Sequence, residues 1–303
     1  STPADLPGFR RMLGDGARFG VCLDYAEQAR PDGLAQAFLI GADFIGADNV
    51  CLVLGDNIFY GHHFSDTLRG AVSRLRGATI FGYHVTNPER FGVVEFDAAR
   101  RVVSIEEKPA QPKSQYAIPG LYFYDNDVVG IAAAIRPSAR GELEIADTIN
   151  GLLALGLRVD TSVTRAHWID TGKMEDILAA NRTVLDTFEP AIDPSAALHG
   201  SALHGMVQLG RESSLDGCTV HGPVVIGSRS RLRNSVIGPY VAIGDGCDVS
   251  DAVLTNTIVM EQSTIRDCPG VRDSMIGRFT VVTGAPAGSR LTLGDHSRFE
   301  AAE

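Results

Sequence analysis

The sequence predicts an α/β domain with a mainly parallel sheet, followed by a domain built as a parallel β-helix. The first prediction rests on apolar strands that alternate with helical segments up to about residue 185. The second rests on aliphatic residues that recur about every six positions beyond residue 190. At 303 residues the chain is longer than a usual single domain. We therefore expect two domains, at residues 1–190 and 191–303.

The alternation in the first half starts from an apolar strand at residues 50–54, which ends in Gly55, Asp56 and Asn57. A helix is expected at 66–75, where apolar residues recur at helical spacing. Strands that alternate with helices in this way favour a largely parallel sheet. The other expected elements are helices at 33–41, 128–135 and 176–185 and strands at 78–85, 92–96, 102–105 and 120–124.

The helical signal almost disappears after Pro190, and short aliphatic stretches take its place. Gly or Asp often follows the aliphatic residue, as in Ile226-Gly227. A β-sandwich is the alternative, but sandwich strands alternate at period two, with turns about every 8 to 12 residues. We prefer a β-helix in which each flat side contributes one inward aliphatic side chain. The expected inward residues are Val220, Ile226, Leu232, Ile237, Ile243, Val249, Leu254, Val259 and Ile265.

Composition disfavours some classes of protein. A net charge of −10 argues against nonspecific nucleic-acid binding, which needs clustered Lys and Arg, but it is compatible with a small anionic substrate. The five cysteines form no C-x-x-C pair, so we expect reduced thiols rather than disulfides or a zinc site. No stretch resembles a membrane span or a signal peptide. We expect a cytoplasmic protein that binds neither nucleic acid nor membrane.

Two charged positions follow predicted strands. Asp56 stands at the carboxyl end of a buried strand, and ligands of open α/β sheets bind in the crevice beyond such ends. Lys108 lies in a Glu-Glu-Lys-Pro run after another strand, where an ammonium group can meet a phosphate. Taken alone, a charge run of this kind is more often a solvated surface.

Two further segments have a functional and a structural interpretation. Trp168 is the only tryptophan and stands two residues before Asp170, hence on the same side of an extended segment. Alone, these residues are better explained as a packing Trp and a helix N-cap. Arg140 and Glu142 either line a ligand site or belong to a capped helix start with acids in its first turn.

Seven blocks of sequence stand in one order: residues 31–38, 54–61, 88–96, 106–109, 120–125, 137–144 and 168–172. Together they resemble the glucose-1-phosphate thymidylyltransferases, a branch of the sugar nucleotidylyltransferases, over nearly all of residues 1–185. The remainder resembles the long form of this family. The resemblance implies a Rossmann-like nucleotidyltransferase sheet followed by a left-handed β-helix.

The resemblance assigns two groups of residues to the nucleotide and its metal. Gln28 and Gly33 would read the thymine edge with an amide side chain and a backbone N–H. Asp56 and Asp170 would hold Mg²⁺ between them, because hard carboxylate oxygens suit that ion.

The resemblance also implies a pocket for the sugar phosphate. Glu107 would accept hydrogen bonds from sugar hydroxyls and Lys108 would bind the phosphate. Phe91 and Gly92 fall where the family usually has Tyr-Gly beside the sugar. The residues that would wall or line the same pocket are Tyr122, Arg140, Glu142 and Trp168.

The implied reaction is attack by the phosphate of glucose 1-phosphate on the α-phosphorus of dTTP, which gives dTDP-glucose and pyrophosphate. No covalent enzyme intermediate is needed. Catalysis would come from positioning and charge neutralisation, with Asp56, Lys108 and Asp170 as the catalytic residues.

The chain departs from the family pattern at three places. Phe91 lacks the hydroxyl of the usual Tyr, and Pro119 stands where Thr is common and lacks a backbone donor. We expect looser sugar discrimination from both. The family's Gly-rich triphosphate loop has no equivalent in these residues. We therefore expect weak nucleotide binding and an unpaired sheet edge in the chain as given.

Three alternatives stay open. A related transferase could use UTP in place of dTTP. The β-helix could be an acyltransferase domain with His199, His204 and His221 as candidate bases, although fold alone is only an analogy. The chain could also be a non-catalytic assembly scaffold. The family resemblance further implies a homo-oligomer.

Overall fold

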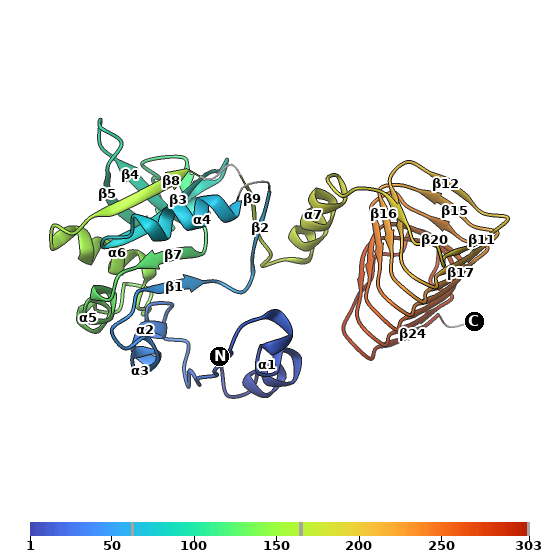
Figure 1. Cartoon of the computed structure of the whole chain (residues 1–303), viewed down its shortest axis with the longest axis horizontal. Coiled ribbons are helices and arrows are strands. Elements are labelled where there is room, and N and C mark those ends of the chain that lie inside the picture. The colour runs from blue at the N-terminus through green and yellow to red at the C-terminus, as the bar shows by residue number, and fades with distance from the viewer. Residues whose placement is uncertain (62–63, 164–165, 302–303) are drawn as a thin grey trace. The chain divides into compact units, whose positions relative to one another are not determined.

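The computed structural model describes residues 1–61, 64–163 and 166–301, which form two compact units. The units are Ser1–Trp168 and Ile169–Glu303 (Figure 1). An α/β unit followed by a parallel β-helix confirms the predicted fold class. The domain boundary between residues 190 and 191 remains a prediction, because compactness does not test which parts fold independently.

The first unit is built on a seven-stranded sheet in the order β1-β7-β3-β6-β4-β5, with β8 beside β3. Its strands are β1 (Val50–Val53), β3 (Ala78–His84), β4 (Gly92–Phe96), β5 (Val102–Glu107), β6 (Tyr116–Ala117), β7 (Leu121–Tyr124) and β8 (Val159–Val163). Outside this sheet lie β2 (Asn57–Tyr60) and β9 (His167–Asp170), and β9 crosses the boundary between the units. The helices are α1 (Leu6–Leu13), α2 (Gln36–Ile40), α3 (Ala42–Ile45), α4 (Phe64–Ser73), α5 (Asp127–Ala134) and α6 (Ile145–Ala154).

Strand pairing in this sheet differs from the mainly parallel pattern that we expected. Strand β7 lies between β1 and β3 and runs antiparallel to both. Among the strands that the structure describes in this sheet, only β3 and β8 pair in parallel. The reason is that no α-helix connects β3 to β7, and a chain without a crossover helix returns antiparallel. Strands β1, β3 and β8 still run in one direction.

Helices cover both faces of the sheet. Alternate residues of β3 and β7 enter two clusters, because successive side chains of a strand point to opposite faces. Ile80 and Tyr124 pack against α2, α5 and α6, whereas Phe81 and Phe123 pack against α4. Strand β1 is an edge strand of the sheet, and its residue Val53 is 55% exposed. The expected unpaired edge is therefore present among the described residues.

The second unit coils as a parallel β-helix after α7 (Met174–Leu185). Val207 pairs with Val224, and Val224 with Val241, so one coil takes 17 residues. Three sides of about six residues account for this length, and the one residue fewer than eighteen appears as a five-residue step, as from Leu232 to Ile237. All nine predicted inward aliphatic residues are 2% exposed or less. The strands are β10 (Ala191–Ile192), β11 (Ala197–His199), β12 (Ala202–His204), β13 (Val207–Leu209), β14 (Ser214–Asp216), β15 (Thr219–His221), β16 (Val224–Ile226), β17 (Arg231–Arg233), β18 (Val236–Ile237), β19 (Val241–Ile243), β20 (Asp248–Val259), β21 (Thr264–Ile276), β22 (Val281–Thr283), β23 (Thr292–Leu293) and β24 (Arg298–Glu300).

Helix α7 packs against β20 and β21 and so belongs to the second unit by its contacts. The five cysteines are free thiols. Among the helices of the described residues, none has the length and apolar character that crossing a membrane requires.

Replacing Leu232 with Ala should destabilise the β-helix by about 2 to 5 kcal/mol, because the side chain is fully buried and its loss leaves a cavity. Hydrogen exchange of peptides from the second unit under increasing urea measures this loss separately from the first unit. Arg231→Ala on the same strand is the control, because this side chain is exposed and its loss should change stability by less than about 0.5 kcal/mol. Equal effects of the two substitutions would contradict the inward assignment.

Candidate active site

Asn57 ties the turn after β1 to distant parts of the first unit. Its Nδ2 donates to Asp56 Oδ1 at 2.8 Å. Its Oδ1 accepts from Trp168 Nε1 at 2.6 Å and from the Gly120 N–H at 2.9 Å. One amide thus orients an exposed carboxylate and a buried indole together. Asn57 is recognisable from sequence as a turn residue but not as a site residue, since its partners are remote in sequence.

An aromatic wall surrounds Trp168, which is 8% exposed. The Phe91 ring meets it edge-on at 5.2 Å between centroids, and the Tyr83 ring does so at 5.5 Å. The sequence analysis expected Phe91 and Trp168 at the sugar pocket, and the structure brings them together. Tyr83 on β3 was missed, because nothing local distinguishes it from other strand aromatics.

The pairing of β4 with β5 sets Gly92 opposite Glu107. A Cβ at Gly92 would lie 3.0 Å from Glu107 Oε2, so the absence of a side chain leaves room for that carboxylate. The Lys108 N–H donates to the Phe91 carbonyl at 3.0 Å. Lys108 is exposed and has a φ of 45°, a left-handed conformation that is uncommon for residues other than glycine. The backbone thus holds Lys108 in an unusual conformation beside Phe91.

Arg140 is surrounded by three glutamates. Its guanidinium lies 3.8 Å from Glu107, 3.3 Å from Glu142 and 3.4 Å from Glu144. Glu144 is only 8% exposed, stands at the start of α6 and also accepts from Ser138 Oγ at 2.8 Å. Arg140 and Glu142 are among the predicted site residues, whereas Glu144 is not, because an acid at a helix start has an ordinary structural explanation.

Burial shifts two ionisation equilibria in this region. The pKa of Glu107 is raised, first by desolvation and then by the negative charge of Glu144, against the lowering effects of Lys108 and Arg140. The pKa of Tyr122 is raised well above its usual value, mainly by burial and further by Tyr124 and Glu107. Tyr122 is 4% exposed, so its neutral phenol is buried beside Glu107 in this part of the site.

Gly33 joins the N-terminal loop to the loop that holds Arg140. Its φ is 117°, and a Cβ there would lie 2.4 Å from backbone atoms of Leu143. Only glycine avoids this overlap. The Leu143 N–H donates to the Asp32 carbonyl at 2.7 Å, and Gln28 Nε2 donates to the Gly33 carbonyl at 3.4 Å.

Eleven of the twelve predicted site residues lie in the unit Ser1–Trp168. A chain of direct contacts and sequence neighbours joins them. Gln28 contacts Gly33, and Arg140 pairs with Glu107. Phe91 packs on Trp168, which Asn57 links to Asp56. We call this connected set the site network. Asp170 ends β9 and falls in the second unit, so its relation to the network stays a prediction.

The two acids named for a metal suit Mg²⁺ by their chemistry. Mg²⁺ is bound by one or two carboxylates together with the phosphates of its substrate and several waters. Asp56 is exposed, and the amide of Asn57 orients its carboxylate, as outer groups commonly orient metal ligands. Among the described residues there is no group of three or more His, Cys, Asp or Glu that could hold a metal ion.

The raised pKa of Glu107 makes the stability of the first unit depend on pH. A raised folded-state pKa favours the neutral form, so this stability is present below the ordinary pKa and is lost as pH rises through the raised pKa. Glu107→Gln keeps the side chain neutral, so its melting temperature relative to wild type should increase between about pH 4 and about pH 8. The exposed neighbour Glu106, changed to Gln, is the control in thermal denaturation. A difference that falls with pH would contradict the assignment.

A family model described as nucleotidyl transferase matches residues 1–187. Curated relatives include the glucose-1-phosphate thymidylyltransferase of Neisseria meningitidis serogroup A, which is 56% identical over 178 residues, or 58% of this chain and 62% of the relative. The Mycobacterium tuberculosis enzyme of that name is 54% identical over 59% of this chain and 62% of the relative. The matched region thus spans 62% of the length of these relatives. A Streptomyces antibioticus protein of the same name is 38% identical over 99% of this chain and 84% of its own length.

Solved structures resemble about three fifths of the chain. A Bacillus anthracis structure, named as a glucose-1-phosphate thymidylyltransferase and solved with sucrose, has a TM-score of 0.55 and 35% identity over 61% of this chain and 74% of that chain. A UDP-glucose pyrophosphorylase with UDP-glucose has a TM-score of 0.50 and 19% identity over 60% of this chain and 73% of that chain, a likeness of fold alone. With a family model that matches more than half of its length, the chain belongs to the nucleotidyl transferase family.

Proposed function

We propose that this chain transfers a thymidylyl group from dTTP to glucose 1-phosphate, which gives dTDP-glucose and pyrophosphate. The observation that carries the proposal is the site network, in which separate sequence blocks meet in one unit. The 38% identity to a thymidylyltransferase along nearly the whole chain supports the choice of nucleotide and sugar.

The sugar phosphate would be bound by β4, β5 and the Arg140 loop. Glu107 would accept hydrogen bonds from sugar hydroxyls, and its partly buried carboxylate lies beside Gly92, where no side chain blocks access. Lys108 is exposed and would pair with the phosphate. Phe91 and Trp168 would pack on the sugar. The remaining pocket residues would be Tyr122, Arg140 and Glu142.

The base would be read at the N-terminal loop. Gln28 carries an amide with both donors and an acceptor, which suits the edge of thymine. Gly33 would offer its backbone N–H from a conformation that only glycine tolerates there. Contact between this loop and Leu143 would keep the base and sugar subsites in one arrangement.

Asp56 and Asp170 would hold Mg²⁺, with Asn57 orienting the first of them. The ion would neutralise phosphate charge in the transition state. The protein groups would align the sugar phosphate for in-line attack on the α-phosphorus, with pyrophosphate as the leaving group. Such catalysis rests on positioning and electrostatics, so no side chain needs to form a covalent bond. A cytoplasmic location and a homo-oligomer belong to the same proposal.

Replacing Lys108 with Ala should lower kcat/KM for glucose 1-phosphate by about 10² to 10³, because an ammonium group that binds and orients the attacking sugar phosphate would be lost. Pyrophosphate release from dTTP and glucose 1-phosphate with Mg²⁺ measures this, with UTP as the competing nucleotide. Lys113→Ala is the matched control, because this lysine is also exposed and its ammonium group pairs with Glu95 rather than with a residue of the site network. A faster reaction with UTP, or no release with either nucleotide, would contradict the proposal.

A further inference from the structure

Three hollows meet at Thr161 on β8, away from the site network. The first has a volume of about 420 Å³ and is lined by Phe96, Asp97, Ala98, Arg100, Tyr116 and Thr161. We call it the hairpin hollow. A second hollow of about 520 Å³ shares Arg100 and Thr161 with it. A third, of about 220 Å³, also includes Thr161. Volumes of this size match those of small-molecule sites.

The hairpin hollow lies at the opposite end of the β4–β5 hairpin from the site network. Gly92 and Glu107 pair at one end of this hairpin, whereas Phe96 and Val102 pair at the other. The turn that follows Phe96 supplies Arg100 to the hollow. A ligand here would therefore not occupy the sugar pocket.

Asp97 builds the turn that presents Arg100. Its Oδ1 accepts from the N–H groups of Ala99 and Arg101, both at 2.9 Å. Its Oδ2 accepts from Arg101 Nε at 2.8 Å. Arg100 is thereby held at a φ of 59°, where glycine is the usual residue. An arginine in this backbone conformation is less stable than a glycine would be. Its side chain makes no hydrogen bond or ion pair within the described residues that would offset this strain.

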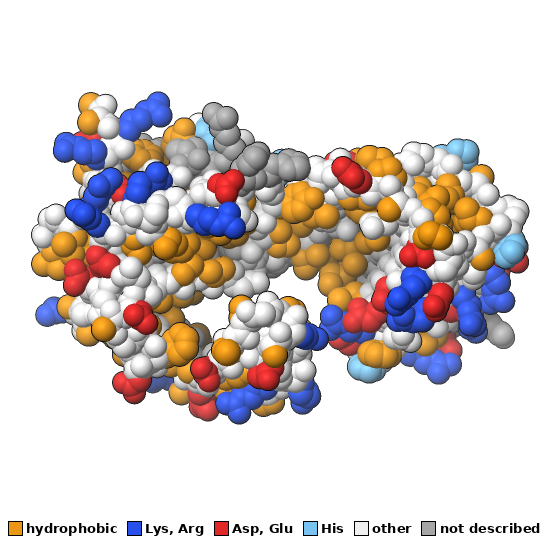
Figure 2. Space-filling view, viewed as in Figure 1, with side chains coloured by type: hydrophobic (Ala, Val, Ile, Leu, Met, Phe, Trp, Pro, Cys, Tyr) orange, Lys and Arg blue, Asp and Glu red, His pale blue; other side chains and the backbone are white. Residues whose placement is uncertain are grey.

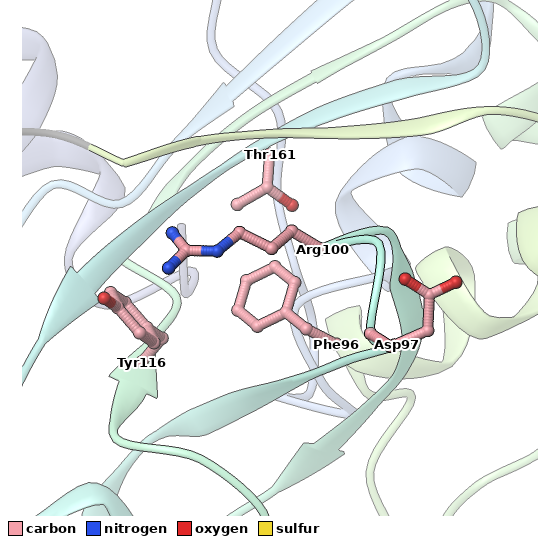
Figure 3. Close-up of a pocket in the computed structure, with 6 residues that line it drawn as sticks. Phe96, Asp97, Arg100, Tyr116 and Thr161 are labelled. Atoms are coloured by element: carbon pink, nitrogen blue, oxygen red, sulfur yellow. The ribbon is translucent and has the colours of Figure 1, made fainter.

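The Arg100 guanidinium has no ion pair or hydrogen bond within residues 1–61, 64–163 and 166–301. Its neighbour Arg101 takes the Asp97 carboxylate instead. Figure 3 shows the Arg100 side chain passing between Thr161 and Phe96 toward Tyr116, with the Asp97 carboxylate at the other end of the side chain. Arg100 is exposed and lines the hollow, so its guanidinium is accessible to a ligand there.

Thr161 adds an unsatisfied polar atom to the same place. Its Oγ1 is buried and has no hydrogen-bond partner among the described residues. A buried hydroxyl without a partner costs about 1 to 3 kcal/mol, and most such groups in proteins are satisfied. Figure 3 shows this side chain pointing toward Arg100. Because this oxygen has almost no accessible surface, it lies beneath the lining of the hollow and is not itself open to a ligand.

The charge around the hollows is opposite in sign to that of the whole chain. The residues that line the three hollows include Arg74, Arg100, Arg101 and Arg158 but only Asp97 and Asp160. Four cations and two anions leave a local excess of two positive charges, in a chain of net charge −10. Figure 2 shows Lys and Arg side chains gathered over β4, β5 and α4. A local cationic region of this kind attracts anions.

We propose that the hairpin hollow and the adjoining 520 Å³ hollow bind a small organic anion with an aromatic or apolar body. Arg100 pairs with the carboxylate, phosphate or sulfonate group. The body packs on Phe96 and Tyr116, whose rings meet edge-on at 5.8 Å, and on the apolar side chains of the second hollow. This site is separate from the proposed transferase chemistry.

Fluorescent probes with and without a charge test the site directly. The anionic probe is 8-anilinonaphthalene-1-sulfonate, and N-phenyl-1-naphthylamine is its neutral counterpart with the same aromatic body. Arg100→Gly removes the guanidinium and suits the left-handed turn, so the variant should fold at least as stably as wild type. It should weaken binding of the sulfonate by roughly tenfold or more and leave the neutral probe unchanged.

Arg229→Gly is the matched control, because Arg229 also has a positive φ, of 55°, but lies in the β-helix. It should change neither affinity. Thr161→Val should raise the melting temperature, since it removes the unsatisfied hydroxyl, and should leave the sulfonate affinity unchanged, because that buried oxygen does not contact the ligand. Inorganic phosphate should not displace the sulfonate at equal concentration. The proposal is overturned if both probes bind equally, if Arg100→Gly leaves the sulfonate affinity unchanged, or if phosphate alone displaces it.

Discussion

The ion pairs of Arg140 hold the site network in place. One guanidinium lies within 4 Å of Glu107, Glu142 and Glu144, which come from the end of β5 and the start of α6. The side chain of Glu144 is 10% exposed and that of Glu107 is 22% exposed, so both carboxylates are partly removed from water. Without the cation, like charges would face one another in this drier region, which is costly. The raised pKa of Glu107 is the remaining sign of that cost.

Asn57 plays the corresponding part on the other side of the network. A single amide satisfies Asp56, Trp168 and the backbone of Gly120, so hydrogen bonds fix the turn after β1 to the aromatic wall. Phe91 in place of tyrosine is consistent with this packing. Its ring meets Trp168 edge-on, a contact that needs no hydroxyl. The effect of Phe91 and Pro119 on sugar discrimination remains a prediction.

Periodicity made the β-helix predictable. Each inward position from Val220 to Ile265 repeats the same local rule, and parallel stacking needs no information from distant sequence. Five of the seven strands in the sheet of the first unit were also located, and 92–96 agrees with β4 to the residue, whereas β6 and β8 were not predicted. Their pairing was not predictable, because a local pattern does not say that β7 enters between β1 and β3. Base, sugar and metal residues came from the matched blocks, and their roles remain predictions.

The residues that sequence reasoning missed share one property. Asn57 and Trp168 are 111 positions apart, and Tyr83 contacts Trp168 from another strand. Glu144 looks like an ordinary helix-start acid until Arg140 is placed beside it. These groups become recognisable only when the fold brings their partners together. The buried Thr161 hydroxyl, which has no hydrogen-bond partner among the described residues, is likewise recognisable only from the structure.

The indole of Trp168 offers the most direct test of the site network, because the chain contains a single tryptophan. A titration with glucose 1-phosphate, followed by the indole N–H resonance in a nitrogen–proton correlation spectrum, reports on this one group. The account predicts a saturable shift of that resonance, since the indole N–H is held by Asn57 at the wall of the proposed pocket. An indole resonance that stays in place at saturating sugar phosphate would contradict it.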